Sequence, residues 1–489
     1  MSQVTIIGAG LAGSLLAIYL AKRGMKVDVY EARGDMRLEE VVAGRSINLA
    51  LSDRGIAALR EVGMDEYMLA EAVPMYGRMI HSPTGETKLL PYSGRSGEYI
   101  NSVSRAGLNI ALMNEAAKYS DVRFHFNERC VGFDTESGEI KFENPLGSLS
   151  SLSSPRSYDT IIATDGAGSA VRQAMEQKVS GFSSTSVFLD HGYKELHIPP
   201  GQNGEFLLEK NALHIWPRHK FMMIALPNFD GSFTCTLFLA HKGGNPSSTE
   251  GTPEPPDEVF QGTLPTGRVS AFETLTDEAA VLEFFNREFP DAVPQMPTLV
   301  EDFFHNPTGH LGTVKCWPWN VDGKALLLGD SAHAVVPFYG QGMNCAFEDV
   351  RVLASLIDDN GFTAETQRRG EGNEEPIEWE DIFRKYGSLR KVNTDSIADM
   401  AEENFYEMRD RVADPVFQRK RELETKLEHT YPDYFSKYSM VTFREDLPYS
   451  VAKEKGNAQD RLLMDICSKV ESVSELDLDE VRNAVSSLK

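Results

Sequence analysis

Apolar residues gather in three runs near the start of the chain, and their lengths predict a β–α–β unit. Val4–Ile7 is a short run of apolar, mostly β-branched residues, which is typical of a buried parallel strand. Leu11–Ala21 has the length and composition of a helix that packs on this strand, and Gly24 ends it. Met25–Tyr30 then predicts a second buried strand, which closes on Glu31.

The turn between the first strand and the helix carries three glycines, Gly8, Gly10 and Gly13, with the spacing G-x-G-x-x-G. At this spacing the first glycine permits a tight turn, the second lets a pyrophosphate approach the backbone, and the third lets helix and strand pack closely. The helix start adds free N–H groups and a partial positive charge. Glu31, eighteen residues after Gly13, is placed to bind a ribose hydroxyl. The pattern predicts a site for FAD or NAD rather than NADP; the alternative is that the glycines serve only a helix–strand turn.

Two later strands end at an acidic residue. Thr160–Ala163 is a buried run that stops just before Asp165, and Ala325–Leu328 stops just before Asp330. A helix begins after each of them, so both strand ends bring a helix N-terminus to the sheet edge that holds the first motif. An acid there can bind a ribityl hydroxyl, although Asp330 can also act as a helix N-cap. His333 is interpreted as a packed histidine rather than a base.

The middle and the end of the chain differ in their periodicity. Weak alternation at Met75–His81 and Thr87–Leu90 predicts a hairpin, and later strand-like runs predict an antiparallel sheet. These runs are Phe182–Leu189, Glu205–Leu208, Ala212–Trp216, Phe221–Leu226 and Phe233–Leu239. The predicted helices that follow are Glu278–Phe289, Ile382–Arg390, Asp395–Arg411, Phe417–His429, Leu462–Val470 and Leu478–Leu488. The polar stretches 146–158, 243–268 and 363–377 are interpreted as loops or insertions.

Composition narrows the class of protein. The chain has 489 residues, of which 41% are hydrophobic, enough for two or three domains with large cores. Its net charge of −24 argues against nucleic acid and against electrostatic binding to an anionic membrane. The five cysteines are scattered and contain no C-x-x-C pair, which favours free thiols in a reducing cytoplasm over disulfides or a zinc site. No apolar run reaches eighteen residues and a core strand begins almost at once, so neither a membrane span nor a signal peptide is expected.

The three motifs, together with Arg105 at the start of a predicted helix over 108–117, resemble the single-component FAD-dependent aromatic hydroxylases. Further segments are similar to the kynurenine 3-monooxygenase family over nearly the whole chain up to about residue 445. These segments are RSINLALS at 45–52, RMIHS at 78–82, YINSVSRAGLN at 99–109, HIWPR at 214–218, FMMIALPN at 221–228, GDSAHAVVPFYGQGMN at 329–344, NFYEMRDRV at 404–412 and YSMVTF at 438–443.

The resemblance implies an α/β fold with three units. They are a Rossmann-like FAD-binding domain with three layers and a parallel sheet at 1–75, 100–180 and 310–365, a substrate domain with a mixed or antiparallel β-sheet at 76–99 and 181–309, and a C-terminal helical region at 376–489.

The resemblance also implies an activity, the hydroxylation of L-kynurenine to 3-hydroxy-L-kynurenine with NADPH and O2 in tryptophan degradation. The oxygen would pass through a flavin C4a-hydroperoxide. FAD would stay bound, whereas NADPH would bind transiently in a shared cleft, because the chain has no second G-x-G-x-x-G. The aniline nitrogen of kynurenine would activate the ring, so no catalytic side chain is assigned and no metal is expected.

Residues of the two sites follow from the matching positions. By pattern alone Arg78 could be a solvated strand residue, but in the family a fixed guanidinium fork suits the carboxylate of the substrate. The residues expected to bind the substrate are Arg78, Tyr99, Leu213, Met222, Phe238, Gln341, Asn404 and Tyr438. The residues expected to bind FAD are Gly8, Gly10, Leu11, Ala12, Gly13, Tyr30, Glu31, Ala32, Arg33, Ala50, Arg105, Cys130, Asp165, Asp330, Met343 and Asn344.

The chain departs from the family in three respects, one of which is the pair of insertions at 243–268 and 363–377, expected to be surface loops. It lacks the hydrophobic C-terminal tail of the membrane-anchored members, so we expect a soluble, cytoplasmic monomer or homodimer without a membrane anchor. Tyr339 stands where relatives often have Phe or His, which could tune the choice of substrate. Two other functions stay open: hydroxylation of another anthranilate-like or phenolic acid, and a non-catalytic flavin-binding redox regulator.

Overall fold

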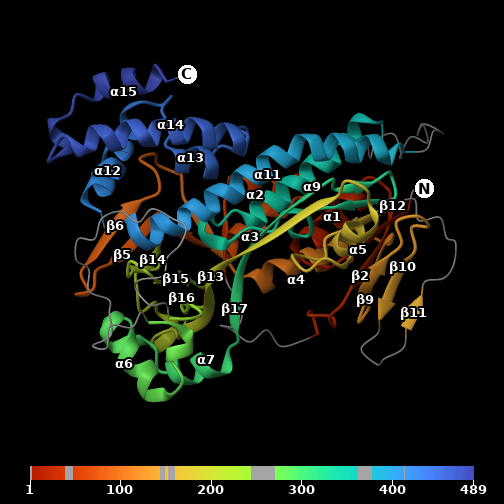
Figure 1. The fold of residues 1–489 in the computed structure, drawn as a ribbon, viewed down its shortest axis with the longest axis horizontal. Coiled ribbons are helices and arrows are strands. Elements are labelled where there is room, and N and C mark those ends of the chain that lie inside the picture. The colour runs from red at the N-terminus through yellow and green to blue at the C-terminus, as the bar shows by residue number, and fades with distance from the viewer. Residues whose placement is uncertain are drawn as a thin grey trace.

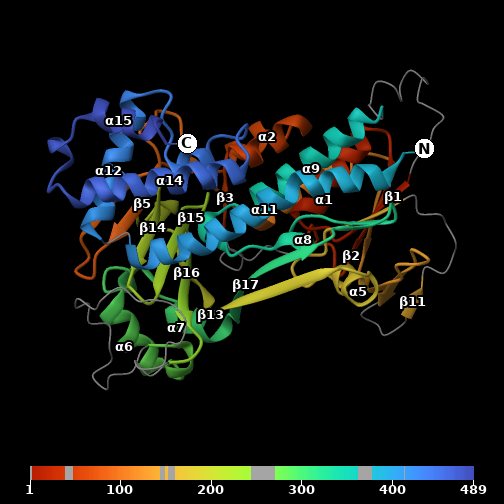
Figure 2. The same ribbon diagram turned by 45° about the horizontal axis from the view of Figure 1, so that its top comes forward.

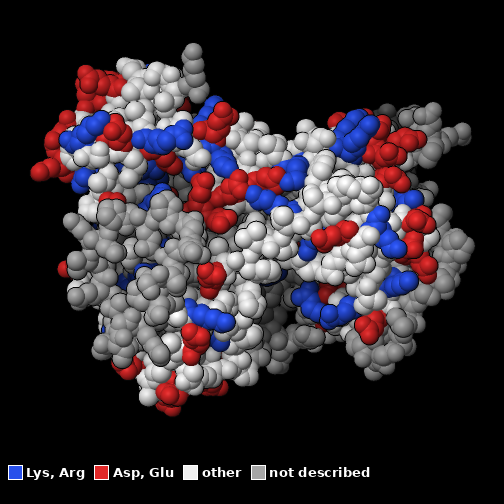
Figure 3. All heavy atoms as spheres, in the orientation of Figure 1, with Lys and Arg blue, Asp and Glu red and all other residues white. Residues whose placement is uncertain are grey.

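The computed structural model describes residues 3–38, 48–143, 149–151, 160–243, 270–361, 377–411 and 414–488 (Figure 1). Two large β-sheets and a set of C-terminal helices make up the described fold. Acidic and basic side chains are interspersed on the face seen in Figure 3. None of the described helices combines the length and the apolar character that a membrane span requires.

The first sheet has six strands in the order β18-β19-β12-β1-β2-β8. They are β18 (Asn320–Val321), β19 (Ala325–Leu327), β12 (Thr160–Ala163), β1 (Gln3–Ile7), β2 (Lys26–Glu31) and β8 (Val122–Phe126). All neighbours pair in parallel except β18, which runs antiparallel to β19. The central strands are apolar on both faces because helices and a small sheet together cover this sheet.

Seven described helices and a small sheet surround the six-stranded sheet, and the helix that follows β12 packs on the small sheet. The helices are α1 (Leu11–Lys22), α2 (Asp53–Val62), α3 (Asp65–Ala70), α4 (Arg105–Ala116), α5 (Ala170–Lys178), α8 (Asp330–His333) and α9 (Gly342–Asp359). The small sheet has the order β11-β10-β9, with β9 (Arg129–Phe133), β10 (Ile140–Glu143) and β11 (Leu149–Ser151). The ring of Tyr30 stacks on Phe142 of β10, which joins the two sheets. A third sheet contains β3 (Leu49–Leu51), β7 (Ile100–Val103) and β4 (Val73–Met75).

The second large sheet has seven strands in the order β17-β13-β16-β15-β14-β5-β6. They are β17 (Thr308–Trp317), β13 (Ser183–Ile198), β16 (Phe233–Ala240), β15 (Met222–Pro227), β14 (Ala212–Pro217), β5 (Gly77–His81) and β6 (Thr87–Pro91). Every pair is antiparallel except β14 with β5, so the sheet is mixed. The helices α6 (Glu278–Glu288) and α7 (Leu299–His305) pack on one face through an apolar cluster. The other face packs on the C-terminal helices.

The C-terminal helices are α11 (Trp379–Asp410), α12 (Pro415–Thr430), α13 (Lys437–Thr442), α14 (Tyr449–Ser468) and α15 (Leu478–Ser486). The first turns of α11 belong to the core of the six-stranded sheet, whereas its later turns belong to the core under the seven-stranded sheet. Figures 1 and 2 both show α11 running from one large sheet to the other. This helix therefore links the two cores.

The predicted fold class is confirmed, and most predicted elements lie within a residue or two of the observed ones. Glu205–Leu208 is wrong as a strand: it is a loop, whose apolar side chains pack on the cluster beneath α6. The two helices predicted over 382–390 and 395–411 are one helix, which runs unbroken through Asn393 and Thr394, and the side chains of these two residues donate to carbonyls of the preceding turn. The helix predicted from Leu462 begins earlier, at Tyr449.

The loop predicted over 146–158 contains the short strand β11 in its described part. The insertions at 243–268 and 363–377 lie almost wholly outside the described residues. The boundaries predicted for the three units stay a prediction.

Candidate functional site

The three strand-end motifs meet at one edge of the six-stranded sheet. The Thr164 hydroxyl donates to the carbonyl of Gly8 at 2.8 Å, which joins the second motif to the first. The Ser331 hydroxyl donates to Asp165 Oδ1 at 2.9 Å, and Gly166 N–H donates to that hydroxyl at 3.0 Å, which joins the second motif to the third. These motifs, far apart in the sequence, therefore form one surface.

The glycine-rich turn fits a dinucleotide. A Cβ on Gly13 would lie 2.0 Å from the carbonyl oxygen of Gly8, so this position needs glycine for close packing. A Cβ on Gly10 would have no described atom within 4 Å, so the backbone there is open to a phosphate. Gly10 caps α1 without a side-chain hydrogen bond, which leaves N–H groups of the first turn for a ligand. A pocket of about 150 Å³ opens beside Ala9 and Glu31.

Glu31 lies at the end of β2 and takes hydrogen bonds on both oxygens. Ala9 N–H donates to Oε2 at 2.9 Å, and the Arg33 side chain donates through Nε to Oε1 at 2.8 Å. Burial raises the pKa of Glu31, but the hydrogen bonds from Arg33 and Ala9 outweigh it, so the pKa lies below its ordinary value. The carboxylate stays ionised and can accept a ribose hydroxyl.

The other residues predicted to bind FAD differ in how far their side chains are exposed to a cofactor. Most follow the joined motifs: Leu11 and Ala12 start α1, and Ala32 and Arg33 follow β2. Met343 and Asn344 start α9, but both are buried, and the Asn344 side chain binds the backbone of Ala50 and Gly340. Ala50 lies beside Gly340, and Arg105 and Asp330 are exposed at the starts of α4 and α8. Cys130 is half-buried on β9, where burial raises the pKa of its thiol to about 12. The ring of Tyr30 is different: it is buried between His125 and Phe142, so only its backbone can face a cofactor.

The residues predicted to wall the substrate ring come together on the face of the seven-stranded sheet that meets the C-terminal helices. Met222 of β15 pairs with Phe238 of β16, and both belong to one buried cluster. Leu213 and Tyr438 pack against this cluster. Asn404 of α11 donates to the carbonyl of Phe338 at 2.6 Å, which holds the loop that leads to Gln341.

Arg78 lies next to this apolar wall and opposite Leu213 in the strand register. Its guanidinium lies 5.1 Å from the ring centroid of Tyr438 and 5.9 Å from that of Tyr92. Its Nη1 lies 3.3 Å from Glu407 Oε1 of α11. Burial lowers the pKa of Arg78, but Tyr438 and Glu407 outweigh it, so the pKa lies above its ordinary value. A fixed, charged guanidinium at the end of an apolar wall can bind a carboxylate.

Tyr99, which the sequence also predicts to bind the substrate carboxylate, contacts a neighbouring tyrosine, and its part in binding stays a prediction. Its ring packs edge-on against Tyr76 at 5.5 Å, and the side chain is half-buried. Tyr92, which the sequence did not single out, lies beside Arg78: its ring stacks on Tyr438 at 5.0 Å, and its buried hydroxyl interacts with the side chains of Arg78 and Tyr438. The hairpin explains the position of Tyr92, because Arg78 pairs with Leu90 and the chain returns beside Arg78 just after β6.

Sequence reasoning also missed Glu407, the ion-pair partner of Arg78, and Tyr449, whose hydroxyl binds Gln341 at 2.9 Å. Glu407 lies within the NFYEMR segment, so its position was a signal that could have been used. Tyr339, the departure from the family, stacks on Tyr438 at 5.7 Å and so lies in the wall of the same site.

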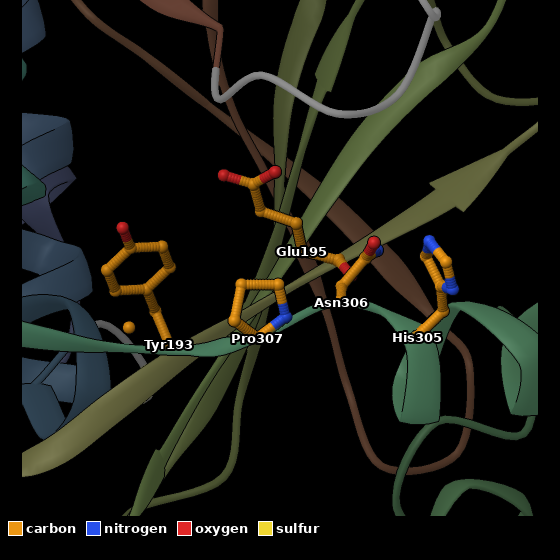
Figure 4. Close-up of a pocket in the computed structure, with 6 residues that line it drawn as sticks. Tyr193, Glu195, His305, Asn306 and Pro307 are labelled. Atoms are coloured by element: carbon orange, nitrogen blue, oxygen red, sulfur yellow. The ribbon is translucent and has the colours of Figure 1, made fainter. Parts of the chain in front are cut away.

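A separate pocket of about 320 Å³ lies between β13 and the turn that joins α7 to β17. Figure 4 shows Tyr193 and Glu195 of β13 together with His305, Asn306 and Pro307, which line this pocket. None of the residues predicted for either site lines it. Burial raises the pKa of Glu195, and the charge of Arg105 opposes this shift.

Comparison with known proteins agrees with this geometry. A family model described as an FAD binding domain matches residues 1–234 and 315–360. A solved 2-methyl-3-hydroxypyridine-5-carboxylic acid oxygenase has a TM-score of 0.60 and 19% sequence identity, over 86% of this chain and 96% of that one. This likeness shows the fold of an FAD-binding monooxygenase.

The curated relatives are more similar. A kynurenine 3-monooxygenase of Myxococcus xanthus is 43% identical over 485 residues, which are 99% of this chain and 95% of the relative. One of Dictyostelium discoideum is 41% identical over 464 residues, 95% of this chain and 92% of the relative. The resemblance found in the sequence is confirmed, and the chain belongs to the kynurenine 3-monooxygenase family of FAD-binding monooxygenases.

Proposed function

We propose that this protein hydroxylates L-kynurenine to 3-hydroxy-L-kynurenine, with FAD as its bound cofactor and NADPH and O2 as co-substrates. The observation that carries the proposal is Arg78, a buried cation placed at the end of an apolar wall next to the loop of Gln341. Kynurenine has a matching form, with a carboxylate at one end and an aromatic amine at the other. The proposal rests on this match together with membership of the family.

Each part of the site has a task in this reaction. Arg78 binds the carboxylate, with Tyr92 and Tyr438 around it, and Asn404 holds the loop before Gln341 in place. Leu213, Met222 and Phe238 hold the ring and exclude water, which protects the reaction from wasteful side reactions. When bound along the joined motifs, FAD would supply the redox chemistry that NADPH and O2 require. The aniline nitrogen donates electrons to the ring, so the step needs no side-chain base.

The same proposal places the protein in the cytoplasm. All five cysteines are free, as expected where thiols stay reduced.

The test is anaerobic reduction of the purified flavoprotein by NADPH in a stopped-flow instrument, with and without L-kynurenine, followed by re-aeration and product analysis. We expect faster reduction with kynurenine and stoichiometric 3-hydroxykynurenine. Faster reduction with only peroxide released would make kynurenine an effector, and the substrate would be another aromatic acid. No effect of kynurenine on the flavin would contradict the proposal and favour a regulator.

A further inference from the structure

Gln341 is a buried polar side chain held by a tyrosine from the C-terminal helices. It precedes α9, is 2% exposed, and lies next to Gly340, which packs against Ala50. Tyr449 begins α14 and is fully buried. Its hydroxyl donates to Gln341 Oε1 at 2.9 Å. Burial raises the pKa of Tyr449 well above its ordinary value, so the hydroxyl remains a donor.

Arg54 fixes the ring of Tyr449. Its guanidinium carbon lies 4.0 Å from the ring centroid, within the range of a cation–π contact. Arg54 is itself fully buried, and its Nη1 donates to Glu348 Oε1 at 2.7 Å. Its other donors bind backbone carbonyls of the segment before Tyr449, those of Val441 at 3.2 Å and Arg444 at 2.9 Å, as well as that of Leu447. A guanidinium with this many partners has one orientation, and so has the ring on it.

The hydrogen bond from Tyr449 decides which end of the Gln341 carboxamide a ligand meets. Since Oε1 accepts from Tyr449, the NH2 group is at the opposite end of the amide. Ser52 Oγ lies 3.4 Å from Nε2 and 3.5 Å from Oε1, so it makes only long contacts and does not choose between the two ends. The NH2 group has no closer partner among the described residues and is left for a ligand. Without the tyrosine hydroxyl, the amide could turn over and present its oxygen instead.

We propose that Tyr449 is a positioning residue of the hydroxylation, and that it orients Gln341 as a hydrogen-bond donor at the boundary between substrate and flavin. The proposal rests on the proposed function, because it assigns the task of this donor to the kynurenine reaction. Tyr449 and Tyr438 belong to one segment, and Arg54 binds its carbonyls. Arg54 therefore anchors both Tyr438, which packs on Arg78, and Tyr449, which orients Gln341.

The test is the variant Tyr449→Phe, which removes the donor and keeps the ring on Arg54. The matched control is Tyr434→Phe, since Tyr434 is also buried in the C-terminal region but its hydroxyl has no hydrogen-bond partner among the described residues. The fraction of oxidised NADPH recovered as 3-hydroxykynurenine rather than peroxide should fall about 3- to 10-fold in Tyr449→Phe, the range expected for one hydrogen bond. Tyr434→Phe should match the wild type.

Three further readouts separate positioning from a merely structural role. The dissociation constant of kynurenine, measured by calorimetry, should change less than about twofold, because the contacts of Arg78 remain. The flavin absorption spectrum of Tyr449→Phe should resemble that of Gln341→Ala and differ from the wild type. Adding Tyr449→Phe to Gln341→Ala should cause no further loss of coupling.

An unchanged product fraction in Tyr449→Phe would overturn the proposal. So would a double variant in which Tyr449→Phe lowers the product fraction of Gln341→Ala as much as it lowers that of the wild type. If the wild type forms no 3-hydroxykynurenine, the proposed function fails instead. In that case the flavin spectra of the ligand-free variants still decide about Tyr449, and a spectrum identical to the wild type would refute its action on Gln341.

Discussion

His214 in β14 gives the protein a stability that depends on pH. Its Nε2 donates to the carbonyl of Glu209 at 2.8 Å, and because a carbonyl only accepts, this nitrogen carries the proton. Its Nδ1 then accepts from Nε2 of His81 at 2.8 Å, and Nδ1 of His81 lies 2.6 Å from Asp291. A proton added at Nδ1 of His214 would point at the N–H of His81, and the two hydrogens would repel each other. Burial is the main cause that lowers the pKa of His214, to about 4.

The size of the effect follows from this value. In the unfolded chain the pKa of the histidine returns to its ordinary 6.5, so between 6.5 and about 4 the unfolded state binds more protons than the folded state. Stability therefore falls as the pH falls through this window. The full difference corresponds to about 3 kcal/mol, at about 1.4 kcal/mol for each pKa unit.

We would measure this with His214→Gln, whose amide can donate to Glu209 and accept from His81 but does not titrate. Urea midpoints and slopes at pH 7.5 and pH 4.5 give the loss of unfolding free energy for each protein, and carboxylates that titrate in both cancel in the comparison. Between these two pH values the wild type should lose at least about 2 kcal/mol more unfolding free energy than His214→Gln loses. His429→Gln, which replaces an exposed histidine, is the control and should behave as the wild type. An equal loss in wild type and His214→Gln would refute the reasoning.

Three further outcomes follow from the site and its supports. Arg78→Met should weaken kynurenine binding at least about 30-fold in calorimetry, because the substrate carboxylate loses a buried charged partner; unchanged binding would remove Arg78 from the site. Tyr92→Phe should weaken kynurenine binding about 3- to 10-fold, whereas Tyr99→Phe should weaken it less than about twofold. A larger effect of Tyr99→Phe would show that Tyr99, rather than Tyr92, binds the carboxylate together with Arg78. Asp349→Ala should lower the unfolding free energy by about 3 kcal/mol in urea titrations, since it leaves Arg390 and His333 without their shared carboxylate. A loss below about 1 kcal/mol would show that this ion cluster is not structural.

The sequence predicted best the parts of the fold whose signals are local. The first β–α–β unit has short apolar strands, a helix of matching length and glycines that only one kind of turn requires, so each signal agrees with the others. The sequence also predicted that the three strand ends meet at one edge, because neighbouring parallel strands place their carboxyl ends together. Whether FAD and substrate contact the assigned residues stays a prediction.

The parts that the sequence did not predict depend on register and on packing between distant segments. Tyr99 lies in a segment that matches the family, but only the pairing of Arg78 with Leu90 shows that Tyr92 returns to the site. Tyr30 lies in the apolar strand β2, and no local signal in the sequence shows that β10, at residues 140–143, covers its ring. Side-chain direction in these cases is set by a neighbour far along the chain.

Buried charged residues show most clearly what the sequence alone does not predict. By its pattern, α11 is a polar helix outside the flavin domain, yet its Arg390 is 3% exposed and binds both Glu348 and Asp349 of α9 at 2.6 Å. Arg54 of α2 binds Glu348 from the other side at 2.7 Å. Burying one such ion alone would cost several kcal/mol, so these groups are tolerable only when all three elements are in place. The C-terminal helices therefore complete the core beside the flavin motifs, and a substitution in α11 can disturb the site without touching any ligand.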